Sequence, residues 1–299
     1  MSDFTSDFWG YYVAIITLVS IAACAILLWA LSSRAPGQKV ETMGHVWDET
    51  LAEYNNPLPN WWRWMFYITI VFSIAYLVLY PGLGRFAGTF NWTSGGQYEG
   101  EQAKAAENYG PLFAKYAAMD IPAVAADSQA REIGQRLFLN YCSQCHASDA
   151  RGSRGFPNLT DGDWLYGGEP ATIKATITTG RNGIMPPFGP VLGEDGVKST
   201  ANYVRSLSGE SHDAALAAKG KEAFATYCVA CHGADARGNP AFGAPTLTDD
   251  TWLHGGSEET IAGTIRNGRN NQMPAWGEFL GEAKTHVLAS YVWGLSNAK

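Results

Sequence analysis

The sequence predicts an all-α protein in which two N-terminal transmembrane helices precede two tandem copies of a small helical domain. Three observations predict this architecture. Two long apolar runs without a single charged residue lie near the N-terminus. The second half of the chain repeats itself at an offset of 86 to 88 residues. In that half, few strand signals are present, which favours mainly helical domains.

The first apolar run covers residues 8–31, which is long enough to cross a bilayer, since a span takes about 20 residues. A cleaved signal peptide is the alternative, and Ile21–Cys24 faintly resembles a lipoprotein cleavage site. However, Asp3 and Asp7 stand where a signal peptide carries Lys or Arg. We therefore expect a retained transmembrane helix within residues 1–35.

The second apolar run covers residues 64–83 and follows a Trp-Trp-Arg triplet at 61–63. Aromatic and cationic residues of this kind anchor helices at a membrane interface. Pro81-Gly82 is expected to end the helix. A buried core helix is the alternative, but two such runs, one with an interface anchor, favour a second transmembrane helix at 61–84.

Charges around these runs predict the topology of the chain. Arg34, Lys39 and Arg63 lie in or beside the segment between the two spans, whereas the N-terminal tail holds no cation. The positive-inside rule then places the 32–63 loop, with 36–60 as its central part, in the cytoplasm and both termini outside. The net charge is −7 and there is no basic cluster, so nucleic acid is not an expected partner.

Residues 85–125 are rich in Gly, Ala, Asn and Tyr, and they predict a linker with a short helix over 101–109. The repeated domains follow at 126–210 and 211–299. Each copy is expected to begin and end with a helix, at about 128–142 and 195–207 in the first and 214–228 and 281–295 in the second, with Asp127 or Ser128 as the first cap. The residues that match between the copies include Gly134/Gly220, Phe138/Phe224, Arg151/Arg237, Trp164/Trp252, Met185/Met273 and Tyr203/Tyr291.

The sequences CSQCH at 142–146 and CVACH at 228–232 carry the chemistry of the repeat. C-x-x-C-H is the attachment motif of a c-type haem. Its two thiols reach the two vinyl groups of the porphyrin, and the histidine that follows lies under the iron. A redox dithiol or half of a zinc site would explain CxxC alone, but not its repetition with histidine in both copies. We therefore predict two tandem cytochrome c domains with two covalently bound haem c groups, held by Cys142, Cys145, His146, Cys228, Cys231 and His232.

A repeated Met-Pro pair supplies candidates for the second axial ligand of each iron. Met185 and Met273 stand at equivalent positions in loops flanked by glycine. Histidine and methionine ligation is the usual arrangement for electron transfer. The spacing suggests that each methionine serves its own domain, but tandem copies also permit exchange, with Met273 on the first haem and Met185 on the second.

Several other repeated or titratable residues have no assigned role. Trp164, Trp252, Arg151 and Arg237 have side chains that can bind a haem propionate, but ordinary packing explains them equally well. His254 replaces Tyr166 of the first copy, so it is not a shared ligand. The remaining histidines have no repeated counterpart and are not expected to bind iron: His45, His212 and His286.

The predicted ligands imply an electron carrier. Two six-coordinate haems leave no free site for a substrate, which argues against a peroxidase or a haem-based sensor and predicts no catalytic residue in this chain. A stand-alone membrane-anchored electron shuttle, or the cytochrome subunit of another respiratory complex, remains an alternative.

The segment around the second span resembles one known family. Gly44–Asp48, Asn55–Trp62, Phe66-Tyr67 and Tyr80–Gly82 are similar to the di-haem subunit (subunit III) of cbb3-type cytochrome c oxidase. The resemblance covers the chain from about residue 40 to its end. The first span occurs in only some members.

This resemblance implies a role, partners and a location. The subunit would take electrons from a donor cytochrome c or the bc1 complex. It would pass them to the mono-haem cytochrome c subunit, and from there to the haem b/b3–copper subunit that reduces oxygen and pumps protons. It also implies the bacterial inner membrane, with the cytochrome domains on the periplasmic side, which agrees with the topology predicted from charge.

Overall fold

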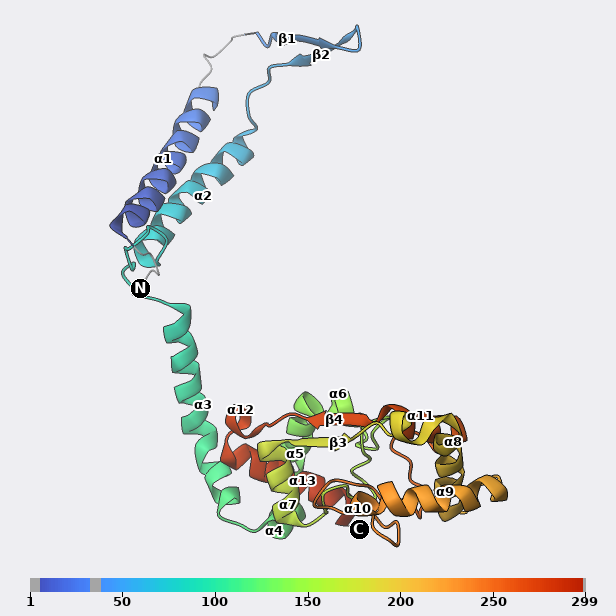
Figure 1. Ribbon diagram of the computed structural model, residues 1–299. Coiled ribbons are helices and arrows are strands. Elements are labelled where there is room, and N and C mark those ends of the chain that lie inside the picture. Colours follow the sequence, from blue (N-terminus) through green and yellow to red (C-terminus); the bar gives the residue numbers. More distant parts are fainter. Residues whose placement is uncertain (1–5, 33–38, 298–299) are drawn as a thin grey trace. The chain divides into compact units, whose positions relative to one another are not determined.

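The structure is a computed structural model that describes residues 6–32 and 39–297 (Figure 1). The chain is mostly helical and divides into two compact units, Met1–Glu107 and Asn108–Lys299. Asp3 and Arg34, which supported the predicted topology, lie outside the described residues.

The first unit contains two apolar helices, α1 (Asp7–Ser32) and α2 (Asn60–Leu79), and both are long and apolar enough to cross a membrane. Helix α2 begins within one residue of the predicted start at 61, and the Trp-Trp-Arg triplet lies in its first turn. It ends before Pro81, where Tyr80 adopts an extended conformation. Near its start, α1 passes the segment after α2 so closely that a Cβ on Gly84 would lie 2.3 Å from the carbonyl oxygen of Gly10.

A β-hairpin lies between these two helices, where only a loop was expected. Strand β1 (Thr42–Trp47) pairs antiparallel with β2 (Leu51–Tyr54), and Trp47 is opposite Leu51. The side chains of β1 are exposed, so no alternation of buried and exposed residues marked the strand in the sequence.

The linker forms a longer helix than predicted, α3 (Ser94–Ala117), which contains Pro111. Proline removes one helical hydrogen bond. The surrounding Ala, Glu, Gln and Lys residues are strong helix formers, and they continue the helix through this position. The end of α3 is anchored in the second unit, where Tyr116 is fully buried against Val124, Ala130 and Val287.

The second unit contains the repeated domains. Helix α4 (Ile121–Ala126) precedes the first copy, whose elements are α5 (Ser128–Tyr141), α6 (Ser143–His146), α7 (Pro170–Thr179), β3 (Arg181–Met185) and α8 (Gly189–Leu207). The elements of the second copy are α9 (Ala214–Tyr227), α10 (Val229–His232), α11 (Glu258–Asn267), β4 (Arg269–Met273), α12 (Gly277–Leu280) and α13 (Glu282–Asn297). Asp127 and Asp213 cap α5 and α9, because each carboxylate accepts hydrogen bonds from amides of the first turn. The terminal helices therefore lie where they were predicted.

The copies exchange their C-terminal helices. Helix α5 packs against α13 of the second copy, and α9 packs against α8 of the first. Equivalent aromatic pairs follow the same exchange: the rings of Phe138 and Tyr291 are 5.7 Å apart, and those of Phe224 and Tyr203 are 5.2 Å apart. Gly134 permits the first of these helix crossings, since a Cβ there would lie 2.5 Å from Cβ of Tyr291.

The expectation of an all-α fold is wrong at the two methionine segments as well. Strands β3 and β4 form an antiparallel two-stranded ribbon, with Gly183 opposite Asn271 at its centre. Their sequences, RNGIM and RNNQM, have low strand propensity. The pairing joins segments far apart in the chain, and no local pattern reveals it.

Two hydrophobic cores result, and each combines both copies. The first contains Phe138 and Ile173 of the first copy, with Leu280 and Leu288 of the second. The second contains Phe224 and Ile261 of the second copy, with Val197, Ala201 and Val204 of the first. Each core therefore depends on the whole second unit rather than on one stretch of sequence.

Candidate functional site

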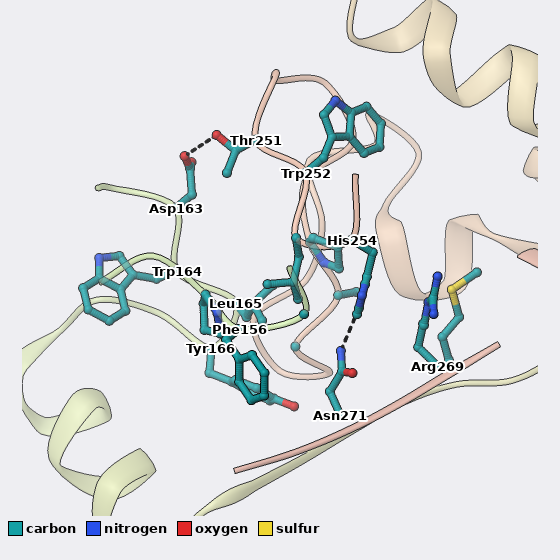
Figure 2. A pocket seen from close by; sticks show the side chains of 18 of the residues that line it. Phe156, Asp163, Trp164, Leu165, Tyr166, Thr251, Trp252, His254, Arg269 and Asn271 are labelled. Atoms are coloured by element: carbon teal, nitrogen blue, oxygen red, sulfur yellow. Dashed lines mark hydrogen bonds between the residues drawn. The ribbon is translucent and has the colours of Figure 1, made fainter. Parts of the chain in front are cut away.

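One large cavity in the second unit is lined by both CxxCH motifs. Figure 2 shows the part of its wall that includes Trp164, Tyr166, Trp252 and His254. Its volume is about 1550 Å³. A pocket for a single small molecule usually measures about 300 to 1,000 Å³, so this cavity has room for more than one ligand. The two motifs, which end on α6 and α10, thus line a single cavity.

Each motif places its histidine deep in this cavity. The Nδ1–H of His146 donates to the carbonyl oxygen of Pro157 at 3.0 Å, and that of His232 donates to Pro245 at 3.0 Å. These bonds fix the ring orientation and leave Nε2 of each ring free to bind a metal. Burial lowers the pKa of both histidines, which favours the neutral form that an iron ligand requires.

The thiol environment disfavours a redox dithiol. Burial, with a smaller contribution from the neighbouring cysteine, raises the pKa of Cys142 and of Cys228 to about 11. Reactive and zinc-binding cysteines instead have lowered pKa values, because the thiolate is the reacting form. The exposed Cys145 and Cys231 complete each pair.

Both methionines lie on the inner face of the β3–β4 ribbon. Alternate residues of each strand are the less exposed ones, so one face carries Arg181, Gly183 and Met185, together with Arg269, Asn271 and Met273. Met273 packs into the core that contains Cys142, and Met185 packs into the core that contains Cys228. The ribbon therefore brings each methionine to the motif of the other copy.

The repeated tryptophans line the cavity beside paired glycines. A Cβ on Gly168 would lie 2.5 Å from the ring of Trp164, and one on Gly256 would lie 2.6 Å from the ring of Trp252. The Nε1–H of Trp252 is buried and has no partner among the described residues. A buried donor without an acceptor is costly, so this indole fits a ligand that carries an oxygen acceptor, such as a haem propionate.

Tyr166 and His254, which differ between the copies, line the same cavity as the two tryptophans (Figure 2). Tyr166 contacts Gly243 of the second copy, and its ring lies 4.8 Å from the guanidinium of Arg181. His254 accepts a hydrogen bond from Asn271 at 3.1 Å. These two rings form the part of the cavity wall where the copies meet.

The other candidates lie elsewhere. Arg151 and Arg237 are exposed at the rim of the cavity, and His45 and His212 are exposed outside it. His286 is buried on α13, away from the cavity lining. The sequence reasoning missed Arg181 and Arg269, although these two arginines and the preceding Thr176 and Thr264 recur at the same offset as the methionines.

The residues present fit a covalently attached haem at each motif. Each site offers two cysteines, a buried histidine with a free Nε2 and a methionine on the ribbon. The unpartnered indole of Trp252 adds a donor for a carboxylate.

Comparison with known proteins agrees with this chemistry. Residues 39–87 match the family described as N-terminal domain of cytochrome oxidase-cbb3, FixP. Residues 129–204 and 215–292 each match the family described as cytochrome C oxidase, cbb3-type, subunit III.

Similar curated proteins cover nearly the whole chain. The cbb3-type cytochrome c oxidase subunit CcoP of Rubrivivax gelatinosus is 50% identical over 297 residues, which is 99% of this chain and 97% of that protein. CcoP of Cereibacter sphaeroides is 38% identical, covering 90% of this chain and 98% of the relative. Subunit FixP of Sinorhizobium medicae is 37% identical, covering 87% and 96%.

These matches confirm the resemblance seen in the sequence, and they establish covalently bound haem c and a place in a membrane-anchored oxidase complex. The chain belongs to the subunit III family of cbb3-type cytochrome c oxidases, whose members are the electron-transferring cytochrome c subunits of that complex.

Proposed function

We propose that this chain is a di-haem electron relay with no catalytic site of its own. Cys142, Cys145 and His146 would hold one haem, and Cys228, Cys231 and His232 would hold the other. A haem bound in this way supplies an iron that alternates between ferric and ferrous states and so carries one electron at a time. The shared cavity carries the proposal, because both attachment motifs line it.

The axial methionines are exchanged between the copies in this proposal. Met273 would complete the haem site of His146, and Met185 would complete that of His232. Two features support the exchange: the packing of each methionine into the opposite core, and the crossed pairing of the terminal helices. The domains at 126–210 and 211–299 are then contiguous in sequence, but each completes the other's haem site.

The roles of the protein groups follow from their contacts. The carbonyl oxygens of Pro157 and Pro245 hold the histidine rings in the orientation that points Nε2 at the iron. The two cores pack against Met273 and Met185. Methionine with histidine as axial pair raises the reduction potential and leaves no open position for oxygen.

We further propose that α1 and α2 both span the inner membrane, with the intervening hairpin in the cytoplasm and the cytochrome domains in the periplasm. The two apolar helices and the cation distribution support this topology. Electrons would then enter from a donor cytochrome c or the bc1 complex. They would leave through the mono-haem cytochrome c subunit for the haem b/b3–copper subunit.

Purification from native membranes tests the proposal. We expect two haem c groups per chain, together with b-type haem and copper from the partner subunits. The reduced haem c groups should not bind carbon monoxide in the native state. Absence of b haem and copper would contradict the assignment to the oxidase, and carbon monoxide binding at haem c would contradict six-coordinate ligation.

A further inference from the structure

Two arginines on the inner face of the β3–β4 ribbon have no anionic partner. Arg181 and Arg269 are half-buried and line the cavity. Neither forms an ion pair with a carboxylate among the described residues. Buried charges are normally paired, because desolvation of an isolated ion is costly. Their environment therefore points to an anion that enters the cavity with a ligand.

Both guanidinium groups are held in place by equivalent contacts. Nε of Arg181 donates to Oγ1 of Thr176 on α7 at 2.9 Å. Nε of Arg269 donates to Oγ1 of Thr264 on α11 at 3.0 Å, and a terminal nitrogen of the same group donates to that oxygen at 2.6 Å. A guanidinium has five N–H donors, so each arginine keeps several donors for another acceptor.

The register of the ribbon assigns each arginine to one haem site. Arg181 is directly opposite Met273, and Arg269 is directly opposite Met185. Thr176 belongs to α7, whose Ile173 and Ile177 lie in the same core as Met273. Thr264 precedes Ile265 on α11, in the core that contains Met185. Each arginine therefore stands beside the methionine that completes one site.

We infer that Arg181 and Arg269 are the carboxylate-binding residues for the haem propionates, Arg181 at the site of Cys142 and Arg269 at the site of Cys228. A planar guanidinium matches a carboxylate with two parallel hydrogen bonds. The repeated Arg151 and Arg237, suggested by the sequence, are less suited because both are exposed. This inference rests on the proposed two-haem arrangement.

The pairing has a consequence for the reduction potentials. A fixed positive charge beside a haem favours the reduced state, since reduction makes the iron site less positive. Loss of the arginine removes this positive charge and leaves the negative charge of the propionate uncompensated. Both changes lower the reduction potential. The effect is largest where water is excluded, because screening by solvent is weak there.

Redox titration of the purified oxidase complex tests the inference with Arg181→Gln and Arg269→Gln. Each variant should lower the potential of one haem c, and the two variants should affect different haems. We expect about a tenfold change in the reduction equilibrium, which is about 59 mV for a one-electron couple. Arg136→Gln is the matched control. Its side chain is 75% exposed on α5 and, among the residues that the structure describes, forms an ion pair with Glu132, so both potentials should stay unchanged.

Two further measurements separate the possible failures. Arg181→Lys and Arg269→Lys keep the charge, so they should recover most of the lost potential, whereas a purely structural role would give no such recovery. Haem content and the absorption band of methionine ligation are measured on every sample. If the native complex contains fewer than two haem c groups, the proposed function fails. If two haems are intact and both Gln variants leave both potentials unchanged, the arginine assignment alone is wrong.

Discussion

The ring of Tyr166 lies against Gly243 of the other copy, and the contact requires a glycine at that position. A Cβ on Gly243 would lie 2.3 Å from Cζ of Tyr166, and the glycine has a φ of +66°. The Tyr166 ring also packs against Arg181, whose Cζ lies 4.8 Å from the ring centroid. We expect Gly243→Ala to lower the free energy of unfolding by about 2 to 3 kcal/mol, from backbone strain and overpacking together. Thermal or denaturant unfolding of the haem-loaded protein measures the change.

Gly193 provides a matched control for this substitution. Its φ is +63°, but nothing lies within 4 Å of the Cβ that an alanine would add. Gly193→Ala should therefore cost only the backbone strain, about 1 kcal/mol. Tyr166→Ala combined with Gly243→Ala should recover part of the loss, because the clash is gone. If Gly243→Ala and Gly193→Ala lower the free energy of unfolding equally, the close contact with Tyr166 does not add to the cost of an alanine at 243.

The helices and attachment motifs could be predicted from the sequence because their signals are local. The cap residue Asp127 directly precedes α5, and each CxxCH motif is five consecutive residues. The repeat also identified Met185 and Met273 as equivalent. What the sequence left open was which motif each methionine approaches, since that depends on pairing between segments far apart in the chain.

The features that the sequence did not predict, the β3–β4 ribbon and its two arginines, also depend on pairing between distant segments. Strands β3 and β4 stabilise each other only across the copies, and neither has a strand-like sequence. The sequence suggested no role for Arg181 and Arg269, and the structure places both on the cavity-lining face of the ribbon. Their repetition together with Thr176 and Thr264 was a signal in the sequence, but its meaning required the cross-strand register.

A mono-haem variant tests the exchanged methionines. Replacing Cys142, Cys145 and His146 by alanine removes the first attachment site and leaves one haem on Cys228 and Cys231. In that background, Met185→Ala should abolish the absorption band of methionine ligation, whereas Met273→Ala should preserve it. The reason is that Met185 packs into the core that contains Cys228.

The reverse pair completes this test. With Cys228, Cys231 and His232 replaced by alanine, Met273→Ala should abolish methionine ligation and Met185→Ala should not. If each methionine instead serves the motif of its own copy, the two backgrounds will give the opposite pattern. Unfolding curves of the mono-haem parents establish that both backgrounds are folded before the methionines are changed.

Arg154 of the first copy binds the second copy beside the cavity. Its Nε donates to the carbonyl oxygen of His254 at 2.8 Å, and the adjacent amide of Gly155 donates to the carbonyl oxygen of Leu253 at 2.7 Å. We expect Arg154→Ala to lower stability by about 1 kcal/mol and to speed amide exchange at Gly155. Hydrogen exchange with mass spectrometry measures the second effect. Arg136→Ala, which removes only an exposed pair within α5, should leave exchange at Gly155 unchanged.

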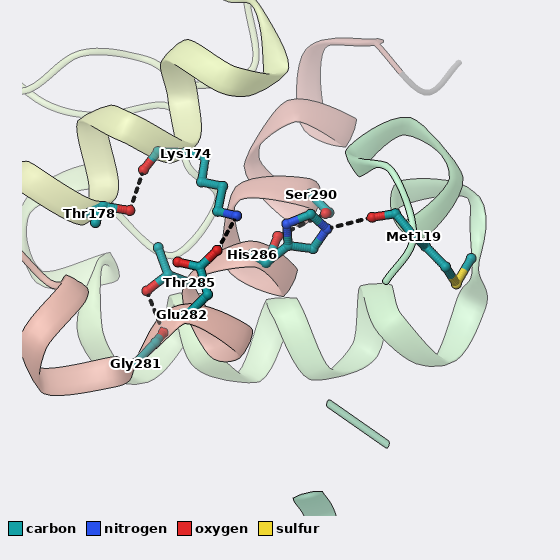
Figure 3. Close-up of polar contacts among 8 residues, drawn as sticks. All are labelled: Met119, Lys174, Thr178, Gly281, Glu282, Thr285, His286 and Ser290. Carbon is teal, nitrogen blue, oxygen red and sulfur yellow. Dashed lines mark hydrogen bonds and ion pairs between the residues drawn. The ribbon is translucent and has the colours of Figure 1, made fainter. Parts of the chain in front are cut away.

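His286 is a buried histidine that should make the second unit sensitive to acid. It is 7% exposed, its Nε2–H donates to the carbonyl oxygen of Met119 at 3.0 Å, and its Nδ1 has no partner among the described residues (Figure 3). Burial, with a contribution from Lys174, lowers its pKa below the ordinary value of 6.5. The bond to Met119 and the charge of Glu282 oppose this shift. The neutral form is therefore favoured in the folded state.

The sign of the pH effect follows from this depressed pKa. Above about pH 6.5 the histidine is neutral in both states, and its contribution to stability is fully present. As the pH falls below that value, the unfolded chain takes up a proton more readily than the folded one, so stability is lost. We expect His286→Gln, whose amide can still donate to Met119, to reduce the loss of melting temperature between pH 7 and pH 5. His212→Gln, at an exposed position, is the control and should leave the change of melting temperature between pH 7 and pH 5 as it is in the unmodified protein. The same change in the unmodified protein and in both variants would refute this role of His286.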